Sequence, residues 1–228
     1  MSRHAPHDFP AHARSGVRAH LWTAFFMFTC TYFAMNAVRA QSSPLNDTGQ
    51  TACNQADSTL ASNCASVEAA MPGQDARFGC DAAQATGQLP AKTGGGNAGF
   101  DFTALDASGT VTLGSHACVR DNVTGLIWST ESLNWASANN AEASYSRCGY
   151  TGGWRLPTRH ELHSIVDFSR TAPAIDSDYF PNTHSAWYGT PDGFAPGGSG
   201  TVWCVDFETG KINGCYKLSA QAHLVRSE

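Results

Sequence analysis

The chain has 228 residues, of which 14% are charged and 22 are glycine. This length is enough for one domain with additional segments, and the composition is typical of an exported, loop-rich protein rather than a cytosolic helical enzyme. Beyond residue 40 the chain contains 10 Lys and Arg against 18 Asp and Glu, and it has no basic run. Nucleic acid and strongly sulfated polysaccharide are therefore not expected as partners, because both need clustered cations.

The N-terminus has the three parts of a secretory signal peptide, which we assign to residues 1–40. Arginines precede the apolar run 21–35, and small residues occupy positions −3 and −1 before Gln41. A charged start, an apolar core and a small-residue exit predict cleavage at that point. The mature protein would then be secreted, periplasmic or on the cell surface, with no stable membrane insertion. The alternative is an uncleaved anchor, since residues 21–38 approach the length of a membrane span.

The first part of the mature chain, residues 41–98, is rich in Ala, Gly and Gln and poor in large apolar residues. We expect it to be partly irregular, with a short helix at 81–87 and a flexible glycine-rich break at 93–99. Aliphatic and aromatic residues become frequent only after it, and five tryptophans lie between residues 128 and 203. The core domain is therefore predicted to span residues 99–228.

Within the core domain, short strands and loops dominate the pattern. We predict strands at 100–105 and 110–113, a hairpin over 118–128, a small-residue helix over 133–145 and a final strand at 222–226. The helix is expected to bury Trp135 and Ala138. There is no alternating strand–helix–strand rhythm, so the fold class is α+β, with an antiparallel sheet and two short helices.

The segment "GGWRLPTRHELHSIVDFS" (152–169) predicts a strand that turns directly into a helix. Pro157 favours an extended residue before it, and Thr158 with Glu161 forms a capping-box signature at the helix start. Leu162, Ile165 and Val166 give the buried stripe. His160 and His163 are one residue too close for the H-E-x-x-H zinc motif and have no third ligand at a matching distance, so we interpret both as surface histidines.

Seven cysteines follow the signal peptide, and disulfides are the default in an oxidising compartment. None of the spacings is C-x-x-C, so neither a zinc site nor thioredoxin-like chemistry is indicated, and we expect no metal and no cofactor. The expected disulfide-bonded pairs are Cys53–Cys64, Cys118–Cys148 and Cys204–Cys215. Cys80 is left over, either free or paired in place of one of these.

The pair Cys204–Cys215 follows from the hairpin "VWCVDFETGKINGCY". If Thr209 and Gly210 form a two-residue turn, the two cysteines lie directly opposite each other on adjacent strands. That placement is within the Cα separation that a disulfide needs. Cys53–Cys64 is favoured because it closes a short local loop.

A candidate ligand-binding region lies at residues 184–203. The glycine-rich stretch from Gly189 to Gly200 is long for a compact domain, and such loops are usually functional or disordered. Aromatic rings beside a carboxylate are typical of a carbohydrate site, because sugar C–H faces stack on rings while hydroxyls form hydrogen bonds. The candidate residues here are Trp187, Tyr188, Asp192 and Phe194. The alternative is that these rings are core residues and that the loop has no ligand.

Several of these segments occur in one order: "CVRDNVTGLIW", "GGWRLPTRHELHSIVDFS", "PAIDSDYFPNT" and "VWCVDFETG". This series, over about residues 100–228, closely resembles the C-terminal domain family of the Legionella collagen-like (Lcl) adhesin. That family is related in fold to C-type lectins and formylglycine-generating proteins. The resemblance therefore implies a disulfide-stabilised, C-type-lectin-like domain with long irregular loops, in which the first and last strands pair.

The resemblance also implies a surface binding or adhesion role, since the best understood member forms trimers and binds sulfated glycans. This chain differs from that member because it has no collagen-like repeat and is acidic. It also lacks the lectin calcium motifs E-P-N and W-N-D, and only Asp206 stands near such a position. We expect an exported bacterial binding module for a glycan or another cell-surface or matrix ligand. The alternative is a non-catalytic structural or protein-interaction domain of the envelope without a small ligand.

An enzymatic role is not indicated. The sequence has no G-x-S-x-G motif, no cysteine–histidine–asparagine order around a nucleophile, and no carboxylate pair in a defined frame. Asp176 and Asp178 in "AIDSDYF" could face one cation from an extended segment. We interpret them instead as turn and capping residues, which is the common role of Asp in such segments.

The assignment of a signal peptide predicts the start of the exported protein. N-terminal sequencing should begin at or near Gln41, because the small residues before it fit the site of the signal peptidase. An exported protein that retains residues 21–35 would contradict cleavage and favour the membrane anchor.

Overall fold

The fold comes from a computed structural model that describes residues 46–61 and 63–228. The predicted signal peptide, residues 1–40, and its cleavage site lie outside the described residues. Among the helices of the described ranges, none is both long and apolar enough to cross a membrane.

The N-terminal part, residues 46–98, holds short elements and the first disulfide. Strands β1 and β2 form a small antiparallel hairpin, and Cys53 is bonded to Cys64. The predicted helix at 81–87 is confirmed as α2, whereas α1 just before it was not predicted. The bounds are β1 Cys53–Asn54, β2 Leu60–Ala61, the 3₁₀ helix η1 Cys64–Ser66, α1 Asp75–Phe78 and α2 Cys80–Ala85.

A four-stranded antiparallel sheet has the order β11-β5-β4-β3. The predicted hairpin over 118–128 is confirmed, because the Asp121 carboxylate accepts hydrogen bonds from the N–H groups of Val123 and Thr124 in its turn. The predicted strand at 110–113 is wrong. Asp106 folds the chain into a tight turn there, and only Val111 forms a bridge back to β3. The bounds are β3 Phe102–Leu105, β4 Cys118–Asp121, β5 Leu126–Ser129 and β11 Val225–Ser227.

A five-stranded sheet has the order β6-β10-β7-β8-β9, and all of its pairs are antiparallel except β10 with β7. The predicted loop Gly189–Gly200 is partly strand, since β7 continues to Gly193 with an irregular register against β8. The rest of the loop contains η2. The bounds are β6 Leu133–Asn134, β7 Trp187–Gly193, η2 Ala195–Gly197, β8 Thr201–Asp206, β9 Lys211–Tyr216, η3 Lys217–Ser219 and β10 Gln221–Ala222.

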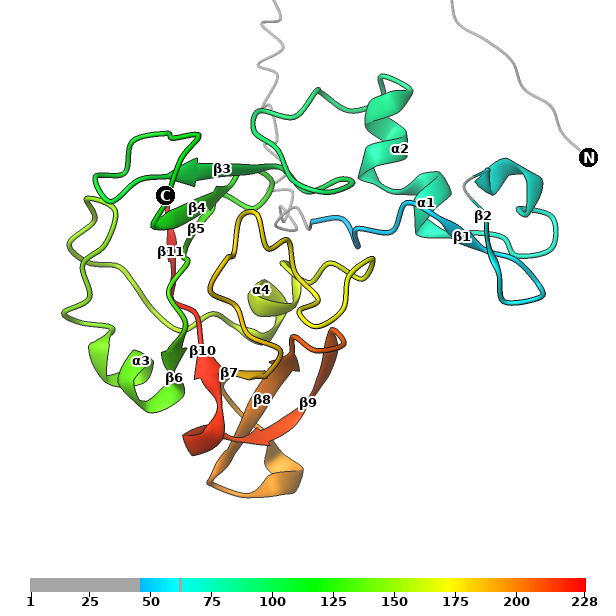
Figure 1. The fold of residues 1–228 in the computed structure, drawn as a ribbon. Coiled ribbons are helices and arrows are strands. Elements are labelled where there is room, and N and C mark those ends of the chain that lie inside the picture. Colours follow the sequence, from blue (N-terminus) through cyan, green and yellow to red (C-terminus); the bar gives the residue numbers. More distant parts are fainter. Residues whose placement is uncertain (1–45, 62) are drawn as a thin grey trace, which may run out of the picture. The chain divides into compact units, whose positions relative to one another are not determined.

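The predicted strand at 222–226 divides between the two sheets. Ala222 pairs with Leu133 in the five-stranded sheet, and Val225 pairs with Trp128 in the four-stranded sheet. The expected pairing of the first and last strands is also wrong, because β11 pairs with β5 while β3 occupies the opposite edge. The C-terminal segment therefore joins the two sheets (Figure 1).

All three predicted disulfides are present, and Cys80 is free. The predicted register of the β8–β9 hairpin is wrong by two residues, however. Its turn has four residues, because the main chain and side chain of Asp206 accept hydrogen bonds from residues 208–210. Cys204 therefore faces Asn213, and its disulfide reaches diagonally to Cys215, with 5.8 Å between the Cα atoms.

The two helices predicted for the core domain are both present. α3, Trp135–Ala141, begins after Asn134, whose side chain caps the Ser137 N–H, and it buries Trp135 and Ala138 as predicted. It ends four residues before the predicted end. α4, Arg159–His163, begins with the predicted capping box between Thr158 and Glu161.

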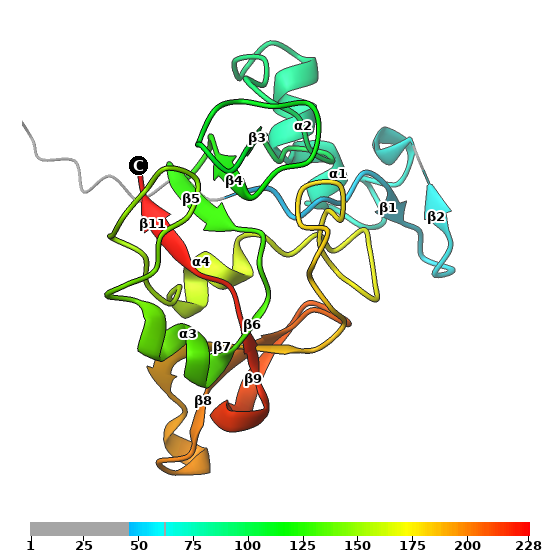
Figure 2. The same cartoon turned by 60° about the vertical axis from the view of Figure 1, so that its left-hand side comes forward.

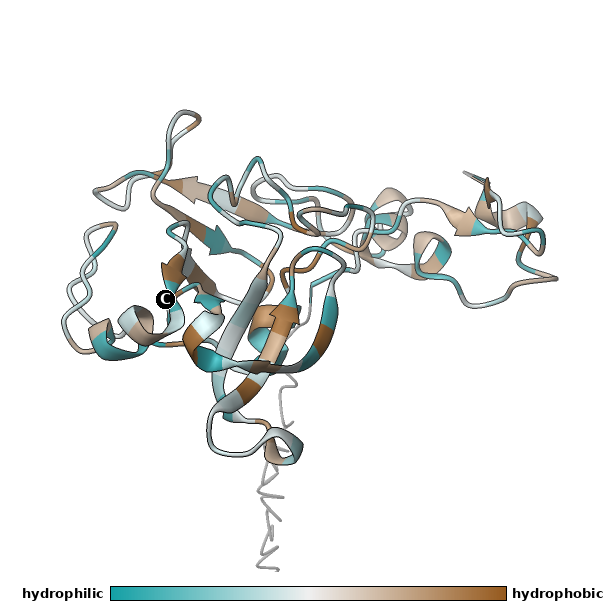
Figure 3. Cartoon of the chain, turned by 60° about the horizontal axis from the view of Figure 1, so that its bottom comes forward, coloured by the Kyte–Doolittle hydropathy of each residue, from teal (hydrophilic) through white to brown (hydrophobic). Residues whose placement is uncertain are grey.

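The main core lies where the two larger sheets and α4 meet. Leu162, Ile165 and Val166 are buried as predicted, and they pack with residues such as Trp128 of β5 and Val205 of β8. Figure 2 shows α4 between the strands of the two sheets, and Figure 3 shows hydrophobic positions along several of the strands. The structure is thus an α+β fold with mainly antiparallel sheets, short helices and three disulfides.

His223 is a fully buried titratable group of this core, between the sheets. Its ring stacks on Tyr188, with 4.8 Å between the centroids. Nδ1 lies 3.0 Å from the carbonyl oxygen of Glu131 and must donate to it, so Nε2 accepts from the Thr183 hydroxyl at 2.9 Å. Burial lowers the pKa of His223 to about 4, because the charged ring would lose its hydration.

We therefore predict that His223 reduces stability as the pH falls. Below about pH 6.5 the unfolded chain binds a proton at this residue that the folded chain does not bind until about pH 4, so stability is lost across this window, by about 3 kcal/mol at its acidic end. His223→Gln should flatten the dependence of the unfolding free energy on pH between these values, measured by urea denaturation. The exposed His160→Gln is the control and should retain the slope; the same slope in both variants would contradict this role.

Candidate functional site

A large cleft, with a volume of about 750 Å³, lies between three loops above strand β3. Its walls are the glycine-rich loop 93–97, the loop 111–116 and the loop 170–179, with residues of β3 between them. This volume is within the range of about 300–1,000 Å³ that is usual for small-molecule sites. The sequence did not indicate this cleft, because its walls come from segments about 80 residues apart.

Arg170 is fixed in the wall of this cleft by two buried carboxylates. Its Nε lies 3.1 Å from Asp167 Oδ2, and its Nη2 lies 3.4 Å from Asp176 Oδ1. The carboxylates are 0% and 4% exposed, whereas the guanidinium side chain is 36% exposed. Buried charges need such partners, because their desolvation costs several kcal/mol per ion. The arginine is therefore held in one place while part of it stays open to the cleft.

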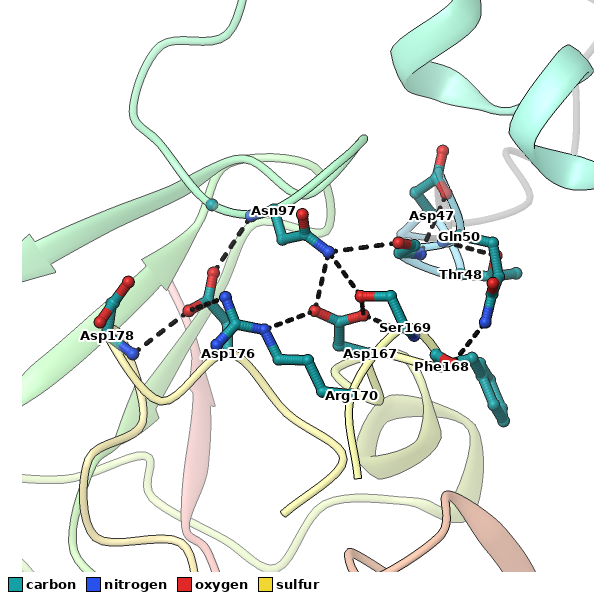
Figure 4. A network of polar contacts seen from close by, with 12 residues as sticks. Asp47, Thr48, Gln50, Asn97, Asp167, Phe168, Ser169, Arg170, Asp176 and Asp178 are labelled. Atoms are coloured by element: carbon teal, nitrogen blue, oxygen red, sulfur yellow. Dashed lines mark hydrogen bonds and ion pairs between the residues drawn. The ribbon is translucent and has the colours of Figure 1, made fainter. Parts of the chain in front are cut away.

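Asn97 connects the glycine-rich loop to the same two carboxylates (Figure 4). Its backbone N–H donates to Asp176 Oδ2 at 3.1 Å, and its side-chain amide donates to Asp167 Oδ2 at 2.9 Å and to Ser169 Oγ. Ser169 donates to Asp167 as well, through both its N–H and its hydroxyl. With these donors the two carboxylates are satisfied, so the loop and the cleft wall form one rigid unit.

The segment 46–50 is joined to this network by hydrogen bonds. The carbonyl oxygen of Thr48 accepts a hydrogen bond from the N–H of Phe168 at 2.8 Å, and Gln50 donates to the carbonyl of the same residue. The carbonyl oxygen of Gly49 accepts a hydrogen bond from the side-chain amide of Asn97. Hydrogen bonds therefore cross the boundary that the sequence predicts between residues 98 and 99.

Tyr179 forms the aromatic surface of the cleft. Its half-buried ring packs against Phe102, with 5.4 Å between the centroids, and its carbonyl oxygen lies 2.7 Å from His116 Nε2. Burial raises the pKa of Tyr179, and the nearby Asp176, Asp101 and Asp178 raise it further. The phenol is therefore neutral at physiological pH, and its oxygen can both donate and accept hydrogen bonds.

The rims of the cleft differ in character. The carboxylate of Asp178 is exposed on one side, next to Tyr179. Val111 and Leu113 are exposed on the other side, the second of them completely. A ligand in this cleft would meet a charged rim, an aromatic ring and an apolar rim.

The structure does not gather the sequence-predicted ligand residues on one surface, although Trp187 of β7 pairs with Asp206 of β8. Trp187 and Tyr188 follow each other on β7 and point to opposite faces of the sheet. Tyr188 is fully buried, and its hydroxyl bonds to Ser132. Asp206 is also buried, and its carboxylate accepts a hydrogen bond from the N–H of Glu208 in the β8–β9 turn.

Asp192 and Phe194 do reach the surface. The carboxylate of Asp192 accepts a hydrogen bond from the Arg159 N–H at 3.3 Å. The ring of Phe194 meets Trp203 edge to face at 4.7 Å, and the guanidinium of Arg159 lies over Trp203 at 4.5 Å. Phe194 also lines a second pocket of about 410 Å³, together with Lys217.

The two histidines of α4 lie at a third, smaller pocket of about 370 Å³. His160 is exposed, and burial lowers the pKa of the half-buried His163. Across residues 46–61 and 63–228, the structure has no group of three His, Cys, Asp or Glu side chains placed to hold a metal ion. Asp176 does have the predicted turn role, since its carboxylate accepts a hydrogen bond from the N–H of Asp178. The pattern Asp167-x-x-Arg170, which completes the network, is too common in sequences to indicate a site by itself.

Residues 117–227 match the family model of the Lcl C-terminal domain. This part of the chain is an Lcl C-terminal domain. The match confirms the resemblance found in the sequence. No curated protein matches the chain. The Lcl C-terminal domain supplies Arg170, Asp176 and Tyr179 to the large cleft, whereas the glycine-rich loop and Leu113 precede the matched residues.

The close approach of Gly49 to Asp167 gives a test of the network. Gly49 has φ +80°, and a Cβ there would lie 2.1 Å from Asp167 Oδ1. Gly125 has a similar φ of +71° but open space around it. An alanine in this conformation costs about 1–2 kcal/mol by itself. We predict that Gly49→Ala costs about 2 kcal/mol more than Gly125→Ala in denaturant unfolding, because it also displaces a buried charged partner; equal losses would contradict the network.

Proposed function

We propose that the protein is an exported, non-catalytic binding module of the bacterial envelope or surface, and that it binds a glycan in the large cleft. The observation that carries this proposal is the juxtaposition of the Tyr179 ring with the fixed guanidinium of Arg170 and the exposed carboxylate of Asp178. A sugar can place its C–H face on the ring while its hydroxyls bond to the charged groups.

The rigidity of the cleft supports binding. Arg170 does not need to be ordered by a ligand, because Asp167 and Asp176 already hold it. A preformed site loses less entropy on binding, so more of the contact energy appears as affinity. The tyrosine is also held in place, through its contact with Phe102 and the hydrogen bond to His116.

Two observations support a location outside the cytoplasm. The Lcl C-terminal domain family suggests an extracellular domain, and three disulfides are typical of an oxidising compartment. Secretion, the periplasm and the cell surface are all compatible with these features, and the proposed signal peptide would provide the route.

The pocket at Phe194 is a second candidate surface for the same function. It includes part of the loop that the sequence indicated, and Phe194 lies there with Trp135 and the cationic Lys217. Trp187 and Asp192 lie on the adjoining strand β7. This pocket is smaller than the cleft, and none of the described residues that line it is a carboxylate that could fix Lys217.

A glycan-array screen of residues 41–228, with and without calcium, tests the proposal. We expect binding that Tyr179→Ala weakens about tenfold, which corresponds to the loss of about 1.4 kcal/mol of stacking and hydrogen bonding. Tyr216→Ala is the matched control, because Tyr216 is exposed and lines none of the three pockets. Its affinity should be unchanged.

The other outcomes are equally specific. Loss of binding in Phe194→Ala, with Tyr179→Ala unaffected, would move the site to the second pocket. Absence of binding to every glycan would contradict the proposal and favour the alternative, a structural or protein-interaction domain of the envelope.

A further inference from the structure

We infer that the large cleft selects sugars that carry a protonated amine over N-acetylated and sulfated ones. This inference rests on the proposed function, because it assigns the charge class of the glycan in the same cleft. Two observations carry it. Carboxylates are in excess around the cleft, and the N–H groups of the glycine-rich loop already donate hydrogen bonds within the protein.

Carboxylates outnumber cations around the cleft. Arg170, Asp176 and Asp178 line the cleft, and Lys92, Asp101 and Asp167 lie next to it, so two cations stand against four carboxylates. His116 also lines the cleft, with its Nε2 2.7 Å from the carbonyl oxygen of Tyr179, and even a protonated His116 would leave the carboxylates in excess. Arg170 is already paired with two of these carboxylates, and the Lys92 ammonium donates to the carbonyl of Gly96 at 2.8 Å. Neither cation is therefore free to compensate a bound anion.

Asp178 is the carboxylate that faces the open cleft. It is exposed, and among residues 46–61 and 63–228 its carboxylate has no hydrogen bond or ion pair. It lies beside Tyr179, whose raised pKa reflects burial first and then the surrounding carboxylates. A ligand ammonium at this position would gain a charge-assisted hydrogen bond, which is about twice as strong as a neutral one.

The glycine-rich loop does not provide an anion site, although its composition suggests one. The N–H groups of Thr93 and Gly94 donate to the Asp101 carboxylate at 2.8 and 2.7 Å. The N–H of Gly95 donates to the carbonyl of Phe102, and that of Asn97 donates to Asp176. These four donors already form hydrogen bonds inside the protein. A bound sulfate or ligand carboxylate would therefore meet few free N–H groups and would be repelled by the aspartates of the cleft.

The test compares three tetrasaccharides of the same length: β-1,4-linked glucosamine, its N-acetylated form and a sulfated form. Titration calorimetry of residues 41–228 at mildly acidic pH should show the amine form binding about tenfold more tightly than the N-acetylated form, and no measurable binding of the sulfated form. The preference should weaken as salt rises, because exposed charges are screened within about 10 Å at 0.1 M.

Asp178→Asn should reduce the preference for the amine to about twofold or less while the N-acetylated form binds as before. Glu208→Gln is the matched control, because this exposed glutamate lies on the β8–β9 turn and does not line the cleft. Thermal unfolding of both variants establishes that they fold. If the control lowers the preference as much as Asp178→Asn does, the effect is one of overall charge and the inference is overturned.

The failures of the two proposals are distinguishable. Binding that requires Tyr179 but does not favour the amine, or that favours the sulfated form, overturns this inference and leaves glycan binding intact. Binding of none of the sugars, together with binding of a lysine-rich peptide, would overturn both and identify a cationic protein partner. An amine preference that survives Asp178→Asn would overturn the role assigned to this carboxylate.

Discussion

The burial of two carboxylates is the constraint on which the described structure depends. Asp167 and Asp176 are almost without exposure, and an ionised carboxylate in such a place is costly unless charged and N–H partners surround it. Arg170, Asn97 and Ser169 provide those partners. Because they come from separate loops, satisfying the two carboxylates also brings these loops together and creates the cleft between them.

The sequence predicted well the features that depend on local chemistry. The capping box of α4, the 118–128 hairpin and the helix that buries Trp135 each follow from residues close together in the chain. It predicted poorly what depends on neighbours distant in sequence. The strand at 110–113 looks like a strand because its residues alternate, but Asp106 turns the chain before it can pair. One buried aspartate at the β8–β9 turn likewise shifted the register of a hairpin whose disulfide was correctly predicted.

The candidate site shows the same division. Aromatic residues near a glycine-rich loop directed attention to β7, yet alternation along that strand places Tyr188 in the core. The residues that form the large cleft appear unremarkable in sequence, since each is a common turn residue or a lone charge. Only the tertiary fold reveals that the part of the chain before the Lcl C-terminal domain contributes two of the three walls and the residues of β3 between them. A cleft built in this way can differ in ligand from other proteins that share the domain.

The division of the C-terminal segment between the two sheets has a consequence for the order in which the protein can fold. Strand β5 pairs with β11, which lies almost 100 residues later in the chain, and β6 pairs with β10 over a similar sequence distance. Closing such long loops is entropically unfavourable until the last partner is present, and folds dominated by distant contacts form slowly. Both sheets therefore stay incomplete until residues 221–227 are available to pair. During that interval β5 has an unpaired edge, and such an edge is a ready template for pairing with another chain.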